Sequence, residues 1–236
     1  MENRKESALI KEIWSNVEAE DVGDDKFVIK HTYKYRHDVS EVFPPWRSNV
    51  IEARKQAKRV IHKARKQGNL SDLKEQIQKM EDKGAFKVLK EDEIMELSEV
   101  PHLFTQYNWV FNPNSESTPF RLITNTSAIN SGTTISIEQM SPQKILNPMI
   151  NSLVRFSLYS VPLCADVASA YHGLLVDTQT ALLRLFFWFW DVDGKLQRGK
   201  VFQQATQAFG DTAAAFGLEV AILKFIVAGV LLSVSK

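Results

Sequence analysis

The apolar positions of residues 49–83 recur with the period of a helix. Between 49 and 67 they fall on one stripe, formed by Val50, Ala53, Ala57, Val60, Ile61 and Ala64. Gly68-Asn69 ends that segment. Ser71, a residue type that caps helix N-termini, begins the next segment, which ends at Gly84. The pattern predicts two helices joined as a hairpin, over 49–67 and 71–83, and a third short helix over 91–99.

Other segments carry runs of β-branched and aromatic residues, which favour strands. The predicted strands are 27–35, 108–111, 120–123, 156–166, 182–190 and 201–203. Asp191-Val192-Asp193-Gly194 is typical of a hairpin turn. Further helices are expected at 145–153, 168–175 and 213–232, a loop at 125–143, and a polar, loosely held, helix-prone lead-in at 1–25. The expected fold class is α+β, an antiparallel sheet with helices.

Three regions follow from these elements: a polar lead-in (1–26), a strand with a basic helical hairpin (27–103), and a more apolar region (104–236). The last predicted helix contains an uncharged run of eleven residues, 225–235, with Glu219 and Lys224 before it. A membrane span needs about 17–25 apolar residues. The pattern therefore favours a buried core helix, and membrane association through this segment is the less favoured alternative.

Composition excludes several classes of protein. Of the 236 residues, 44% are hydrophobic and 24% charged, which does not fit a disordered chain. A single cysteine excludes an internal disulfide, and the charged start lacks the apolar region of a secretory signal. We therefore expect an intracellular protein, cytoplasmic or nuclear. The net charge of +1 hides a division, since 20 of 29 basic and 20 of 28 acidic residues lie within 1–100.

The predicted helix over 49–67 is strongly basic. Against Glu52, its only acid, it carries Arg54, Lys55, Lys58, Arg59, Lys63, Arg65 and Lys66. Such a helix is either a surface that contacts nucleic-acid phosphates or the solvated face of a helical hairpin. The candidate nucleic-acid-binding residues are Arg54, Lys55, Lys58, Arg59 and Lys63.

One acidic residue stands at an unusual place. Asp166 follows an apolar predicted strand and precedes a run of small residues that ends at Tyr171. A carboxylate there could ligate magnesium, and small residues allow backbone N–H groups to approach a triphosphate. The alternative is that Asp166 simply caps the following helix.

Several segments resemble, in one order over about residues 33–225, the reverse transcriptases of Bel/Pao-type retrotransposons, which carry long terminal repeats. The segments that carry the resemblance are 33–49 with the basic helix, 73–86, Trp109–Pro113, Phe120–Ala128, Ala165–Tyr171, Leu185–Trp190 and Gln207–Ala215. The first two resemble the family's lead-in and its entry into the fingers, and Trp109–Pro113 and Phe120–Ala128 together resemble the fingers hairpin. The last three resemble the first catalytic palm motif, the strand that follows it, and the motif that grips template and nucleotide. The resemblance implies polymerase fingers with a partial palm, preceded by a helical hairpin.

The resemblance also implies a role for individual residues in RNA-directed DNA synthesis. Asp166 would bind two magnesium ions, with the backbone of Val167 as a further ligand. The backbone at Val167, Ser169 and Ala170 would help to hold the triphosphate. Tyr171 would be the gate against a ribose 2′-hydroxyl. Arg121 would reach the triphosphate from the fingers, and Phe209 and Gly210 would line the nucleotide pocket. The implied partners are an RNA or DNA template-primer and deoxynucleoside triphosphates.

The sequence also departs from the family pattern. Asn125 stands where the family usually has an acid, Ala215 stands where it usually has proline, and no Tyr-x-Asp-Asp motif is present. Because one carboxylate cannot hold two divalent ions, we expect a truncated domain that does not polymerise alone. A non-catalytic nucleic-acid-binding remnant is the alternative. The strand 182–190 could leave an exposed edge that favours self-association.

Overall fold

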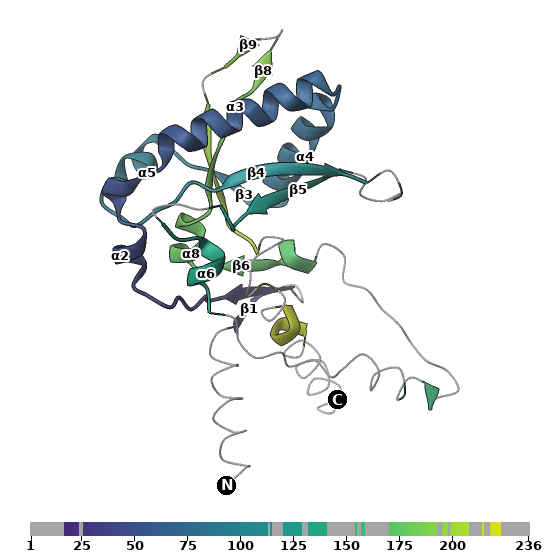
Figure 1. The fold of residues 1–236 in the computed structure, drawn as a ribbon. Coiled ribbons are helices and arrows are strands. Elements are labelled where there is room, and N and C mark those ends of the chain that lie inside the picture. The colour runs from purple at the N-terminus through teal and green to yellow at the C-terminus, as the bar shows by residue number, and fades with distance from the viewer. Residues whose placement is uncertain are drawn as a thin grey trace.

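The computed structural model describes residues 17–23, 26–112, 114, 120–128, 132–140, 154, 157–158, 170–192, 195–197, 199–207, 214 and 218–222. Small, mainly antiparallel sheets combine with helices, of which α3 and α4 pack on the central strands, so the expected α+β class is confirmed (Figure 1). The strand orders are β1-β2-β6, β3-β10-β7, β4-β5 and β8-β9.

The predicted helical hairpin is confirmed. Helix α3 (Val50–Lys66) buries its apolar stripe, and α4 (Leu70–Asp82) buries Leu73 and Ile77. Gly68 adopts a φ of 75°, which turns the chain between the two helices and lets the Asn69 N–H reach the Ala64 carbonyl at 2.9 Å. The short helix is α5 (Glu91–Glu96).

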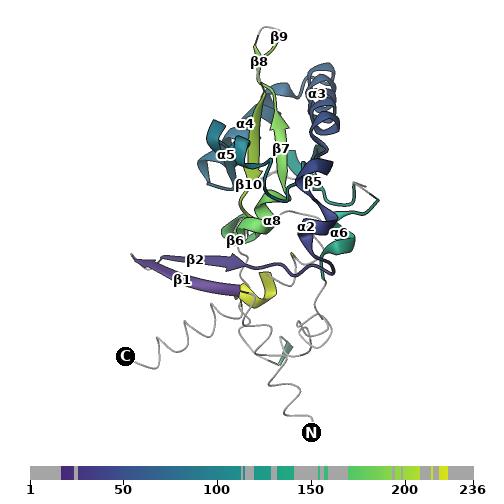
Figure 2. The same cartoon turned by 90° about the vertical axis from the view of Figure 1, so that its left-hand side faces the viewer.

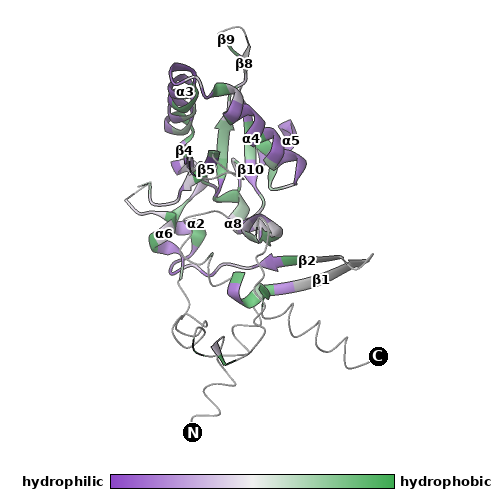
Figure 3. Cartoon of the chain, turned by 90° about the vertical axis from the view of Figure 1, so that its right-hand side faces the viewer, coloured by the Kyte–Doolittle hydropathy of each residue, from purple (hydrophilic) through white to green (hydrophobic). Residues whose placement is uncertain are grey.

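A three-stranded antiparallel sheet forms the centre of the main core. It contains β3 (Phe86–Val88), β10 (Lys200–Gln204) and β7 (Leu185–Trp188), with β10 in the middle. Every residue of β7 is buried, as expected for a strand that is covered on both faces. β7 consists only of apolar residues, and Figure 3 shows the neighbouring helices α3 and α4 with much of their surface in the hydrophilic colour. One cluster of buried side chains joins this sheet to α3, α4 and the β4–β5 hairpin.

The predicted strand 182–190 is shorter than expected, because α8 (Thr178–Leu182) occupies its start. Asp177 caps α8 by accepting a hydrogen bond from the Thr180 N–H at 2.9 Å. The first residue of β7 is also hydrogen-bonded on its other side, since the Thr105 N–H donates to the Leu185 carbonyl at 2.7 Å. That part of the edge is therefore covered, and self-association through it stays a prediction.

The predicted hairpin β4 (Gln106–Phe111) and β5 (Phe120–Asn125) is confirmed. Its register pairs Trp109 with Leu122 and Val110 with Arg121. The ring of Trp109 stacks on Phe120 at 5.0 Å, on the face that α3 and α4 cover.

Long-range strand pairing overturns one local prediction and part of a second. Residues 17–23, expected in a helix-prone lead-in, form β1 (Val17–Gly23), which pairs antiparallel with β2 (Lys26–His31). Residues 168–175, expected as a helix, contain the 3₁₀ helix η2 (Ala170–Gly173) followed by β6 (Leu174–Val176), which pairs parallel with β2. The intrinsic preference of a residue for helix or strand contributes less free energy than strand pairing and the burial that accompanies it, so the pairing decides the structure here. Figure 2 shows β1 and β2 below the other strands.

The remaining elements are short. They are α2 (Val39–Val42), the 3₁₀ helix η1 (Pro45–Arg47), α6 (Ile135–Glu138) within the expected loop 125–143, and the hairpin of β8 (Asp191–Val192) and β9 (Lys195–Leu196). The last confirms the predicted turn after residue 190.

Three predicted elements lie largely outside the described residues. The strand prediction for 156–166 is wrong at its start, where residue 157 is helical and residue 158 lies in a turn. The helix 145–153 cannot be placed, because it lies wholly outside the described residues. The helix predicted over 213–232 is present at 214 and 218–222. Among the described residues, no helix has the length and apolarity needed to cross a membrane.

Candidate nucleic-acid interface

Helix α3 presents two kinds of surface because its residues advance by about 100° each. The buried side is formed by Ala53, Val60, Ile61 and Ala64. The opposite side carries residues spaced i, i+4, i+7 and i+11, all of them exposed: Lys55, Arg59, His62 and Lys66. We call these four residues the outward row. Figure 1 shows α3 along the outer side of the molecule.

Three other basic residues of α3 lie on its flanks, over aromatic rings of the core. On one flank the Arg54 guanidinium lies 4.9 Å from the Phe187 ring centre and the Lys58 ammonium 5.4 Å from that of Phe189. On the other flank the Lys63 ammonium lies 5.1 Å from the Trp109 ring centre. Such contacts hold a cation through the ring quadrupole. These side chains therefore help to fix α3 on β7 and β4 while their charges remain at the surface.

The five predicted nucleic-acid-binding residues thus divide into two groups. Lys55 and Arg59 belong to the outward row, whereas Arg54, Lys58 and Lys63 belong to the flanks. Lys55 also pairs with Glu52 at 3.1 Å, an exposed contact of small energetic value. The prediction did not include His62 and Lys66, although the helical spacing of the buried stripe was sufficient to place both on the outward side.

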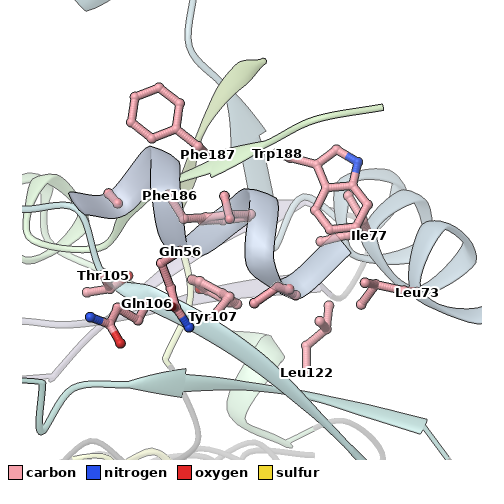
Figure 4. A pocket seen from close by; sticks show the side chains of 13 residues that line it. Gln56, Leu73, Ile77, Thr105, Gln106, Tyr107, Leu122, Phe186, Phe187 and Trp188 are labelled. Atoms are coloured by element: carbon pink, nitrogen blue, oxygen red, sulfur yellow. The ribbon is translucent and has the colours of Figure 1, made fainter. Parts of the chain in front are cut away.

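A cavity lies beneath α3, between this helix and strands β4 and β7 (Figure 4). It encloses about 390 Å³ of space, which includes open solvent. Most of the lining side chains are apolar or aromatic, with Gln56, Thr105, Gln106 and Tyr107 carrying the polar groups, and no lining residue is Asp, Glu, His, Lys or Arg. The Tyr107 hydroxyl donates to the side-chain carbonyl of Gln204. The cavity is therefore best understood as space between packed elements.

The predicted nucleotide-binding residues are only partly described. Asp166, Val167, Ser169, Phe209 and Gly210 lie outside the described residues, so their predicted roles cannot be assessed. Ala170 and Tyr171 lie in η2, both partly buried. Next to them, burial lowers the pKa of His172, and the positive charge of Lys83 at the end of α4 lowers it further.

Arg121 is exposed on β5, and the register of the hairpin places it on the opposite face from Trp109 and Leu122. Directly paired residues share a face of a sheet, so Arg121 lies on the same face as Val110. Trp109 and Leu122 lie on the face next to α3. The structure therefore does not bring Arg121 and the outward row together.

A buried polar network, which the sequence analysis did not identify, joins the end of β2 to α8, to Arg184 before β7 and to Gln207 after β10. The Asp177 carboxylate accepts hydrogen bonds from the Tyr33 N–H at 3.1 Å and the Thr180 hydroxyl at 2.7 Å. The fully buried Arg184 places its guanidinium 4.7 Å from the Tyr33 ring centre. The only local signal was the capping pattern Asp177–Thr180; the other contacts join residues far apart in the chain.

His31 belongs to the same network. It is 2% exposed, stacks beside Tyr33 at 4.4 Å, and its Nδ1 lies 2.5 Å from the Gln207 side-chain amide. Burial and, to a smaller extent, the Arg184 cation lower the pKa of His31 to about 4, although the Asp177 carboxylate opposes both effects. His31 is therefore neutral at physiological pH. The network connects the sheets inside the protein and exposes no proton donor to solvent.

No family model matches the chain, and no curated protein matches it in sequence. Among the described residues, no group of three or more His, Cys, Asp or Glu side chains is arranged to hold a metal ion.

Proposed function

We propose that this chain is a reverse-transcriptase-like domain, comprising fingers and part of a palm, and that α3 binds nucleic acid. The outward row carries the proposal: Lys55, Arg59, His62 and Lys66 are exposed on a helix with seven Lys and Arg residues against one acid. At 1.5 Å per residue the row extends about 16 Å. Along a duplex strand this length covers about five phosphates.

The flank contacts support the same proposal. A long basic side chain loses conformational entropy when it binds a phosphate. Arg54, Lys58 and Lys63 are already oriented by the rings beneath them, so part of that loss has occurred in the free protein. The helix therefore presents a positively charged surface that is partly preorganised for a polyanion.

The type of two elements is consistent with the resemblance, since the basic segment is a helix and the segments that resemble the fingers hairpin pair as β4 and β5. The hairpin α3–α4 precedes the hairpin β4–β5, which precedes β7 and β10. The sequence resemblance places the basic helix, the fingers hairpin and the strand after the first palm motif in this same order.

The proposal includes binding but not unaided polymerisation. Two-metal phosphoryl transfer needs several carboxylates around the two ions. The 236 residues contain no Tyr-x-Asp-Asp motif. Magnesium at Asp166 and Val167 stays a prediction of the resemblance, and we derive no chemical step through it.

Salt-dependent binding tests the proposal. Affinity for a fluorescein-labelled single-stranded RNA is measured by anisotropy between about 50 and 200 mM salt. Neutralising two phosphate contacts in R59Q/K66Q should weaken binding. It should also reduce the slope of log affinity against log salt by about 1.4, since each contact to a single strand contributes about 0.7.

The matched control is K79Q/K83Q, which removes the same charge from exposed positions at the end of α4. This control should leave the slope unchanged. Equal slopes for R59Q/K66Q and K79Q/K83Q, or no salt-dependent binding by the parent protein, would contradict the proposed function.

A further inference from the structure

Trp46 is the most exposed large apolar side chain among the described residues, at 81%. The segment around Trp46 is packed against the protein, because Phe43, three residues earlier, is buried in a second apolar cluster. The exposure of Trp46 is therefore not due to a loosely held chain. Tryptophan has a large apolar surface, which most folds cover at least in part. An indole left in solvent on an otherwise well-packed segment is therefore a feature to be explained.

The backbone on both sides of Trp46 is held in place. Trp46 lies in η1, where the Arg47 N–H donates to the Pro44 carbonyl at 3.0 Å and the Ser48 N–H to the Pro45 carbonyl at 3.2 Å. Pro44 and Pro45 restrict the backbone further.

A second set of hydrogen bonds anchors the residues between η1 and α3. Asn49 donates to the Phe104 carbonyl at 2.7 Å and accepts from the Phe104 N–H at 3.0 Å. The Ser48 hydroxyl lies 2.8 Å from Nε2 of His102, which is itself buried. The indole is thus presented on a fixed turn, and little backbone freedom is lost when a ligand covers it.

The charge around Trp46 indicates what could cover it. Arg47, the next residue, is exposed, and α3 begins only four residues after Trp46. The basic side chains of this helix run from Arg54 to Lys66. Trp46 therefore directly precedes a basic helix in the chain. Proteins that bind single-stranded nucleic acid combine an exposed aromatic ring with cations, because bases stack on the ring and phosphates contact the cations.

We propose that Trp46 stacks on a base of a single-stranded RNA or DNA whose phosphates lie along the outward row of α3. This inference rests on the proposed function and adds to it a preference for unpaired bases. Bases within a duplex are stacked on one another and cannot cover the indole, whereas an unpaired base can.

The test compares W46A, W46L and W46F with the parent protein. Leucine retains an apolar side chain but has no ring face for a base, and phenylalanine retains a smaller ring. We expect W46A and W46L to bind a single-stranded RNA of about 16 nucleotides roughly tenfold or more weakly, and W46F to recover much of the affinity. Binding to a duplex of the same length should change little, and the salt slope should stay that of the parent, because no phosphate contact is lost.

The same experiment separates this inference from the proposed function. If R59Q/K66Q reduces the salt slope while W46A and W46L bind single strands as the parent does, the stacking inference is wrong and the α3 interface stands. Equal weakening for single strands and duplexes would also overturn it. So would unchanged RNA binding accompanied by loss of self-association in sedimentation, since the indole would then serve a second copy of the chain. W46L and W46F differ only in the ring, so their comparison decides the question even if W46A folds poorly.

Discussion

Burial of His31 makes the free energy of unfolding depend on pH, because its pKa differs between the folded and the unfolded chain. Its side chain is buried between β2, β6 and β10, against Tyr33 and Gln207. The folded pKa is about 4, against an ordinary value of 6.5. Between these two pH values the unfolded chain binds a proton at this residue and the folded chain does not.

The sign and the magnitude follow from that difference. Stability contributed by neutral His31 is fully present above about pH 6.5 and is lost as the pH falls toward 4, because acid favours the unfolded state. A pKa difference of about 2.5 corresponds to about 3 kcal/mol at 1.36 kcal/mol per pKa unit. This amount already includes the effect of the positive charge of Arg184 on the ring.

The assay is urea unfolding, followed by tryptophan fluorescence, at about pH 7.5, 6.0 and 4.5. In the variant H31Q the residue stays uncharged at every pH. Its stability difference between about pH 7.5 and 4.5 should therefore be smaller than that of the parent by about 2–3 kcal/mol. H62Q is the control, since His62 is exposed in the outward row and its replacement should leave the pH profile unchanged.

Two results would refute this reasoning. One is a pH profile for H31Q that matches those of the parent and H62Q. The other, which does not depend on any variant, is an NMR titration of the folded parent in which the His31 imidazole protonates near pH 6.5.

Three further predictions concern single residues. In G199A the new Cβ would lie 2.6 Å from the ring of buried Phe189, so we expect the free energy of unfolding in urea to fall by about 1–3 kcal/mol. G173A, where nothing lies within 4 Å of the new Cβ, is the control. Equal losses in the two variants would contradict the packing argument. D177A removes the cap of α8 and the acceptor of the Tyr33 N–H, and should lower stability by about 1–3 kcal/mol, more than D38A at the exposed cap of α2. D166N should leave primer extension unchanged, because the parent chain alone should show none; extension that depends on Asp166 would disprove this.

The sequence by itself was sufficient for the elements whose signals are local. The hairpin α3–α4 follows from an apolar stripe of helical period and from Gly68, whose φ of 75° ends α3. The hairpin β4–β5 and the turn after Trp190 follow from short β-rich runs separated by turn residues. In each of them the residues that determine the structure are neighbours in the chain.

Tertiary structure decided the rest, because the deciding partners are distant in sequence. Polar residues 17–23 become a strand only by pairing with β2, and β6 becomes one by pairing with the same strand some 145 residues away. The contact of His31 with Gln207 spans 176 residues, and no local pattern indicates that this imidazole is buried. The proposed interface depends on sequence and on tertiary structure. The helical period of the sequence places the outward row on one side of α3. Only the packed structure shows that Arg54, Lys58 and Lys63 lie over aromatic rings and that Trp46 is exposed. Burial and long-range contact are properties of the whole fold, so they cannot be inferred from the residues adjacent in the chain.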